Sequence, residues 1–119
     1  MRSLLFLLIL TSLISCADPS DQLVGNWVAT SVILDEQTVD IDLSLVGFEF
    51  DENGKYSFNS TLDYREAGVY EVVDNKLMTK DTINGQGKKS VLIDQMDSDT
   101  LKLRMKNPEG WMELTLARE

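Results

Sequence analysis

Apolar and polar residues alternate along most of this chain, from Leu23 to its end. A period of two residues is typical of β-strands that bury one face and expose the other. Eight alternating segments follow one another, and turns rich in Gly, Asn, Asp and Pro separate them. The strands predicted in this way span residues 25–34, 46–50, 55–59, 68–73, 76–82, 90–96, 101–106 and 111–116.

Short connections between these segments make each strand the antiparallel neighbour of the next. Because one face of every strand is apolar, a meander of eight strands buries that face best by closing on itself. We therefore predict an all-β fold, an eight-stranded antiparallel up-and-down meander that closes into a β-barrel, in one domain over residues 23–119. Residues 35–45 keep only a weak alternation, which fits either an extra strand or a short helical turn.

The first residues of the chain have the pattern of a secretory signal peptide. Arg2 precedes an apolar stretch over residues 4–14. As a helix this stretch would be roughly 16 Å long, about half the thickness of the hydrocarbon core of a membrane. A charged start followed by a short apolar core is typical of a signal peptide rather than of a membrane-spanning helix.

The end of this stretch, Leu13-Ile14-Ser15-Cys16, resembles the lipobox of bacterial lipoproteins. The resemblance implies a lipoprotein signal peptide over residues 1–15, cleavage before Cys16 and acylation of Cys16. Residues 16–22 are polar and interrupted by Pro19, which predicts a flexible tether. The protein would then be lipid-anchored in the bacterial cell envelope, with the membrane and the face left open. The alternative is a structural cysteine that follows an ordinary signal peptide.

Composition narrows the function further. Asp and Glu number 20 against 11 Lys and Arg, for a net charge of -9, and the chain has no histidine and one cysteine. An acidic chain lacks the clustered cations that bind nucleic acid, and the absence of histidine removes the commonest general base. The sequence holds no Ser-His-Asp set, no Cys-His pair and no phosphate-binding Gly loop. We therefore expect no catalytic residue, no cofactor and no nucleic-acid partner.

Two groups of acidic residues are candidates for calcium ligands. They lie within residues 35–42 and 94–99. Neither group has the ligand spacing of an EF-hand loop. Carboxylates at such positions also cap turns or face solvent, so we expect no metal site.

Several short motifs, taken in order, resemble the small lipocalin-like domains found in bacterial lipoproteins. The motifs are Leu23-Val24-Gly25-Asn26-Trp27, Phe48-Glu49-Phe50-Asp51-Glu52-Asn53-Gly54-Lys55-Tyr56, Gly68-Val69-Tyr70, Leu101-Lys102-Leu103 and Leu114-Thr115-Leu116-Ala117-Arg118. The resemblance spans residues 23–118 and implies a lipocalin-like β-barrel in which Trp27 lies across the closed end, with Arg118 packed over its indole. A guanidinium over an indole contributes roughly 0.5–2 kcal/mol. Alternatively, Arg118 is a solvated residue at a frayed chain end.

The resemblance also implies a small hydrophobic ligand in the mouth of the barrel. The residues that would contact it are Phe48, Phe50, Tyr56, Phe58, Tyr70, Leu77, Leu103 and Met105. The opposite interpretation is a barrel filled by these same side chains, because several of them are large aromatics.

Two functions follow from these alternatives. The first is a lipid-anchored carrier or sensor of a small hydrophobic molecule. The second is a protein-interaction or inhibitor module, in which the filled barrel is a scaffold and an envelope protein is the partner. Residues 84–89, with Lys88 and Lys89 on an otherwise acidic chain, form a candidate contact loop for the second function; the alternative is an ordinary solvated hairpin loop. In both cases we expect a monomer.

Overall fold

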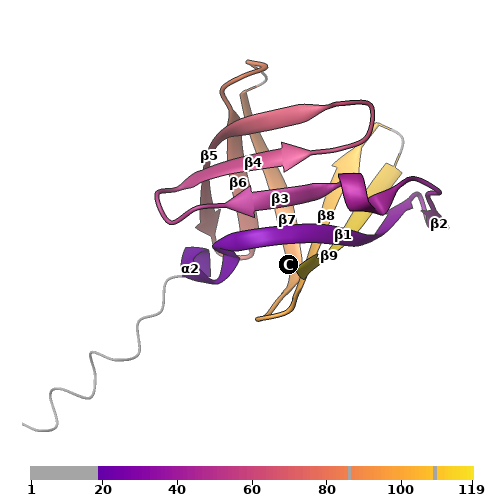
Figure 1. Cartoon of the computed structure of the whole chain (residues 1–119), viewed down its shortest axis with the longest axis horizontal. Coiled ribbons are helices and arrows are strands. Elements are labelled where there is room, and N and C mark those ends of the chain that lie inside the picture. The colour runs from indigo at the N-terminus through magenta and orange to yellow at the C-terminus, as the bar shows by residue number, and fades with distance from the viewer. Residues whose placement is uncertain (1–18, 86, 109) are drawn as a thin grey trace, which may run out of the picture.

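The structure is a computed structural model, and it describes residues 19–85, 87–108 and 110–119 (Figure 1). The signal peptide predicted over residues 1–15 and the acylated Cys16 lie outside the described residues. Within the described ranges, no helix combines the length and the apolar character needed to cross a membrane.

The described chain is almost entirely β-structure. A short helix, α2 (Pro19–Leu23), precedes the first strand, and a 3-10 turn, η3 (Leu43–Leu45), lies before the third. The strands are β1 (Gly25–Leu34), β2 (Gln37–Thr38), β3 (Gly47–Phe50), β4 (Lys55–Asn59), β5 (Arg65–Val73), β6 (Lys76–Asp81), β7 (Gly87–Met96), β8 (Thr100–Asn107) and β9 (Gly110–Arg118).

Neighbouring strands pair antiparallel in the order β2-β1-β3-β4-β5-β6-β7-β8-β9, and β9 returns to pair with β1. Strand β2 has two residues, pairs with the last residues of β1 and is not part of the barrel wall. The remaining eight strands form the closed barrel (Figure 1). The predicted eight-stranded antiparallel meander that closes into a barrel is therefore confirmed.

The segment over residues 35–45 contains both a short strand and a helical turn. Asp35 and Glu36 turn the chain with left-handed backbone angles, φ 51° and 68°, and β2 then pairs with β1. Asp42 caps η3, because its carboxylate accepts a hydrogen bond from the backbone N–H of Ser44 at 3.1 Å. The residues of this segment that pack against the core are Val39, Ile41 and Leu43.

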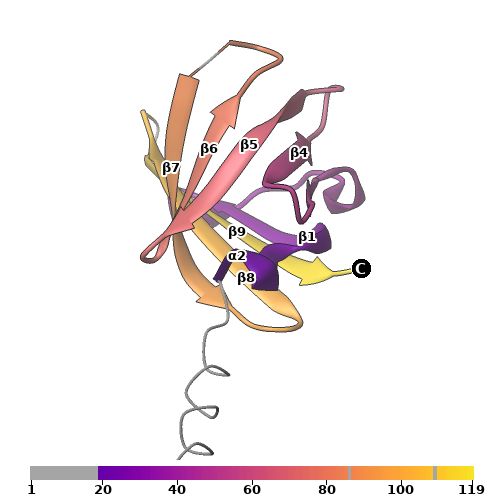
Figure 2. The same ribbon diagram turned by 90° about the vertical axis from the view of Figure 1, so that its left-hand side faces the viewer.

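The two ends of the barrel differ. Because neighbouring strands are antiparallel, successive connections alternate between the ends. Helix α2 and the β5–β6 and β7–β8 turns lie at one end, and the β4–β5, β6–β7 and β8–β9 connections lie at the other (Figure 2). Leu23 of α2 is fully buried and covers the first end, which we call the closed end; the other is the open end. Residues 19–22, which we expected to belong to the flexible tether, lie in α2.

The alternating apolar side chains form the core inside the barrel. A bulge between Ala29 and Ser31 interrupts the pairing of β1 with β9 and lets both Ala29 and Val32 face inward. The buried apolar residues are Leu23, Trp27, Ala29, Val32, Val46, Phe50, Tyr56, Tyr70, Leu77, Val91, Leu101, Leu103, Leu114 and Leu116.

Candidate functional site

At the closed end, Arg118 of β9 lies over the indole of Trp27 of β1. The guanidinium carbon is 4.2 Å from the ring centroid, and the two residues are paired across the β1–β9 ladder. The indole Nε1 donates a hydrogen bond to the carbonyl of Leu23 at 2.9 Å. The guanidinium donates to the carbonyls of Gln22 at 2.8 Å, Val24 at 2.7 Å and Ser98 at 2.7 Å. The structure thus brings together the two residues that the resemblance assigned to barrel closure.

An aromatic row covers the inner face of β3 and β4. Phe48 is stacked on Phe50, with ring centroids 5.1 Å apart, and lies 4.6 Å from Phe58. Phe50 meets Tyr70 of β5 edge-on at 4.9 Å. Pairs at such distances contribute about 0.5–1.5 kcal/mol each beyond their buried area. Because these rings contact one another, they fill the barrel next to β3 and β4.

The eight residues predicted to contact a ligand differ in their burial. Five of them are buried, namely Phe50, Tyr56, Tyr70, Leu77 and Leu103. Three are partly buried and pack against the core, namely Phe48, Phe58 and Met105. Five surface depressions of about 120 to about 420 Å³ stand out on the described chain, and each includes at most one of the eight residues. The buried members of this set are therefore part of the packed core, and the partly buried members keep some exposed surface.

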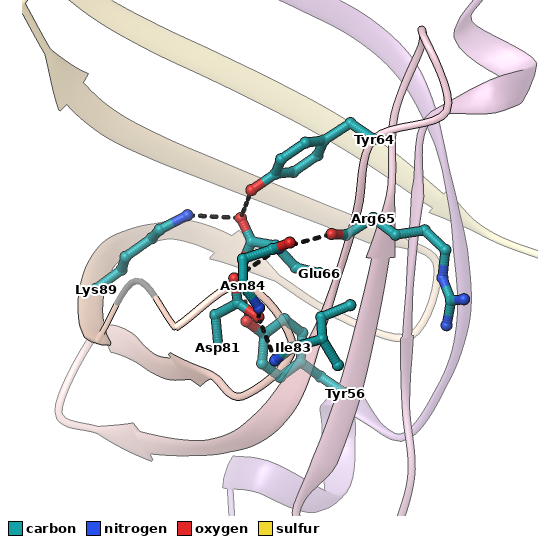
Figure 3. A network of polar contacts seen from close by, with 8 residues as sticks. All are labelled: Tyr56, Tyr64, Arg65, Glu66, Asp81, Ile83, Asn84 and Lys89. Carbon is teal, nitrogen blue, oxygen red and sulfur yellow. Dashed lines mark hydrogen bonds and ion pairs between the residues drawn. The ribbon is translucent and has the colours of Figure 1, made fainter.

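A polar cluster lies on the inner face near the open end (Figure 3). Its centre is Glu66 of β5, which is 7% exposed. The carboxylate accepts hydrogen bonds from the hydroxyl of Tyr56 at 2.9 Å, from the hydroxyl of Tyr64 at 2.7 Å and from the ammonium of Lys89 at 2.5 Å. We call these four residues, Tyr56, Tyr64, Glu66 and Lys89, the Glu66 cluster.

A second buried carboxylate lies beside the Glu66 cluster. Asp81, the last residue of β6, accepts hydrogen bonds from the backbone N–H groups of Ile83 at 3.0 Å and Asn84 at 3.2 Å. The side-chain amide of Asn84 donates to Asp81 at 2.8 Å and to the carbonyl of Arg65 at 2.8 Å. These bonds hold the β6–β7 connection against β5 (Figure 3), and so fix the wall of the barrel around Glu66.

Hydrogen bonding keeps the two carboxyls ionised. Burial raises the pKa of Glu66, but the bonds from Lys89, Tyr64 and Tyr56 outweigh burial and lower the pKa from its ordinary value of 4.5. Burial likewise raises the pKa of Asp81, but the bonds from Asn84 and Ile83 outweigh burial and lower the pKa from its ordinary value of 3.8. Burial and the bond to Glu66 both raise the pKa of the Tyr56 hydroxyl. At neutral pH, Glu66 is therefore an anion. It contacts the neutral hydroxyl of Tyr56 and the ammonium of Lys89.

Neither Glu66 nor Lys89 was assigned to the inner face from the sequence, although the alternation of the strands contains the signal. Tyr70 is buried, so Glu66, an even number of positions before it on β5, faces the same way. Lys89 precedes the buried Val91 by two positions on β7. Because burying a charge is costly, only the apolar members of each alternating series were assigned to the inner face.

The candidate contact loop over residues 84–89 is wrong in its bounds, because β7 begins at Gly87. Lys88 pairs with Lys80 of β6 and is exposed. Adjacent strand residues point to opposite faces, so Lys89 points inward to Glu66. The two lysines therefore do not form one basic surface.

The acidic turns act as local caps. Asp97 accepts hydrogen bonds from the backbone N–H groups of Asp99 at 3.0 Å and Thr100 at 2.8 Å. These bonds, the one to Asp99 first, lower the pKa of Asp97. In the part of the chain that the structure describes, no group of three or more carboxylate or thiol side chains could hold a metal ion.

The fold is similar to that of solved bacterial proteins. A lipocalin-like protein from Bacteroides uniformis superposes with a TM-score of 0.64 and 14% sequence identity, covering 82% of this chain and 99% of that chain. An uncharacterized protein from Bacteroides eggerthii gives a TM-score of 0.58 and 13% identity over the same shares. No protein-family model and no curated protein matches the sequence. The chain therefore has a lipocalin-like barrel domain, and at these identities the likeness concerns the fold alone.

Proposed function

We propose that this protein is a non-catalytic binding protein that holds a small molecule at the open end of its barrel. The Glu66 cluster is the observation that carries this proposal. Burying the Glu66 carboxylate is costly even when it is paired, and apolar side chains of similar volume often stabilise a core as well or better. A charged cluster on the inner face of a small barrel therefore favours a binding role over a purely structural one.

The ligand expected from this geometry is amphipathic. Its apolar body would contact the partly buried side chains Phe48, Phe58 and Met105, and its polar group would meet the Glu66 cluster. Phe58 and Tyr64 lie 6.3 Å apart, so the apolar and polar contacts are adjacent. The ligand would enter between the β4–β5 and β6–β7 connections.

The proposal includes a lipid anchor in the bacterial cell envelope. It rests on the lipobox resemblance of Leu13-Ile14-Ser15-Cys16. Acylation of such a cysteine would add a diacylglycerol and an amide-linked acyl chain, which together exceed the two lipid signals that stable membrane attachment needs. The described chain enters the barrel through α2 at the closed end. An anchor that precedes α2 would therefore leave the open end directed away from the membrane.

Equilibrium titration with N-phenyl-1-naphthylamine, a neutral apolar fluorophore, tests the binding proposal. Saturable fluorescence with one probe per chain is the expected result. Phe58→Ala should weaken binding several-fold, because the ring borders the site. Val69→Ala, on the outer face of β5 and exposed, is the matched control and should leave the affinity unchanged. Absence of saturable binding to the wild-type protein would refute the proposal.

A second candidate, the protein-interaction or inhibitor module, is favoured by the β4–β5 connection. Leu62 is 97% exposed, and Leu62 and Asp63 adopt left-handed angles of φ 62° and 58°. Such backbone costs about 1–3 kcal/mol at a non-glycine residue and is often found at functional sites. A photo-cross-linking residue at position 62 should capture one envelope protein in the native host, and the same residue at exposed Glu71 of β5 should not. Identical products from both positions would reject this candidate.

A further inference from the structure

The ion pair between Lys89 and Glu66 has two unequal members. The Glu66 side chain is 9% exposed, whereas the Lys89 side chain is 39% exposed. Two tyrosine hydroxyls hold the carboxylate in addition to the ammonium. Glu66 is therefore fixed in the barrel wall, and Lys89 is the member that can move toward solvent while the two hydroxyls still hold the carboxylate.

The chemistry around Glu66 selects a cation. The carboxylate is an acceptor of hydrogen bonds, and the rings of Tyr64 and Phe58 lie beside it, 6.3 Å from each other. Ammonium groups are attracted both to a carboxylate and to the faces of aromatic rings. An anionic head group that contacts Lys89 would lie near the Glu66 carboxylate, where like charges repel.

The charge of the surrounding protein also favours a cationic ligand. The hydrogen bonds described at the open end involve three charged groups. These are the carboxylates of Glu66 and Asp81 and the ammonium of Lys89. The whole chain carries a net charge of -9. Such a field raises the local concentration of cations and lowers that of anions.

We propose that the ligand of this barrel carries an alkylammonium head group, which binds Glu66 by displacing the ammonium of Lys89. In the ligand-free protein, the ammonium of Lys89 then occupies the position that the head group of the ligand would take. Its four-carbon stem occupies a volume that the first methylenes of an alkylamine can take over. This inference rests on the proposed function, because it specifies the ligand for the same open end.

Three compounds with one alkyl chain and different head groups test the inference: octylammonium chloride, 1-octanol and sodium octanoate. Isothermal titration of the wild-type protein near neutral pH should give the tightest binding for octylammonium. The expected preference over 1-octanol is about tenfold or more, since hydrogen bonds to a charged group exceed neutral ones by this order. Equal or tighter binding of octanol or octanoate would overturn the ammonium inference and leave the proposed function intact. If none of the three binds, both are refuted.

Variants at the cluster test the displacement step. Glu66→Gln should abolish the preference for octylammonium over 1-octanol. Lys89→Ala removes the competing ammonium and should tighten octylammonium binding about tenfold. Lys88→Ala, the adjacent and outward-facing lysine, is the matched control and should change the affinity by less than about twofold. An unchanged affinity in Lys89→Ala would contradict displacement.

If Lys89→Ala is partly unfolded, thermal melting replaces the binding titration as the test. Butylammonium should raise the melting temperature of Lys89→Ala, because it restores the cation and the stem that the substitution removes. 1-Butanol at the same concentration should raise it less, and the control variant Lys88→Ala should respond like the wild-type protein. Equal effects of butylammonium and butanol on Lys89→Ala would show that the site does not select a cation.

Discussion

Two tryptophans each lie under an arginine, yet they differ in burial. Trp27 is 1% exposed, with Arg118 at 4.2 Å, whereas Trp111 is 43% exposed, with Arg104 at 5.0 Å. Trp27→Ala should lower the free energy of unfolding by about 3–5 kcal/mol, because it leaves a cavity at the closed end. Trp111→Ala should cost less than about 1 kcal/mol. Denaturant titration measures both losses, and equal losses would contradict the seal at the closed end.

The Glu66 carboxylate predicts a dependence of stability on pH. Its pKa is lowered in the folded protein from 4.5, so its contribution is present above about pH 4.5 and is lost as the pH falls through the lowered pKa. Glu66→Gln lacks this contribution and should be less stable than the wild-type protein by about 1–3 kcal/mol near neutral pH. Denaturant titrations between about pH 7 and pH 3 should show the difference shrinking in acid. A difference that is constant over this range would indicate that the charge of Glu66 has no role.

At the residue scale, sequence reasoning identified the inner-face apolar residues and missed the polar ones. Phe50, Tyr56 and Leu77 follow directly from alternation, because apolar burial and period agree. Glu66 and Lys89 follow from the same period but contradict the expectation that charges stay outside. Their pairing depends on the register of two strands that the sequence separates by a further strand, β6, and alternation within one strand does not fix that register.

At the scale of elements, β5 and β6 pack closely at Gly68. A Cβ at this position would lie 1.9 Å from the carbonyl oxygen of Lys80. Gly68→Ala should therefore force the two strands apart and lower the free energy of unfolding by about 1–3 kcal/mol. Val69→Ala, at the adjacent exposed position, should cost less than about 1 kcal/mol. Thermal melting distinguishes the two variants, and a Gly68→Ala protein as stable as the wild type would show that the strands are free to separate.

The elements themselves were largely predictable, because turn residues bound each alternating segment. Asp51 illustrates the reason: its carboxylate accepts the backbone N–H groups of Asn53 and Lys55, both at 2.9 Å, so the β3–β4 turn is encoded locally. The bulge between Ala29 and Ser31 was not predictable, because it depends on pairing with distant β9. Residues 35–45 were ambiguous for the same reason, since β2 is defined only by its contact with β1.

At the scale of the whole molecule, the lipid anchor makes a prediction about processing. The wild-type chain, expressed in a bacterium with lipoprotein processing, should enter the detergent phase in a Triton X-114 separation and carry the mass of acyl chains on Cys16. Cys16→Ser should stay in the aqueous phase, because acylation needs the thiol. Intact-protein mass spectrometry checks both forms. A mature wild-type protein with a free thiol would reject the anchor while leaving the binding site untouched.

We propose that the barrel binds a small molecule at its open end. Chemical-shift mapping by solution NMR, with N-phenyl-1-naphthylamine added to the isotope-labelled domain, tests it most directly. Saturable shifts are expected at the amides around Phe58, Glu66 and Lys89, and none around Trp27 and Arg118. Shifts centred on the closed end, or spread over the outer face, would contradict the claim.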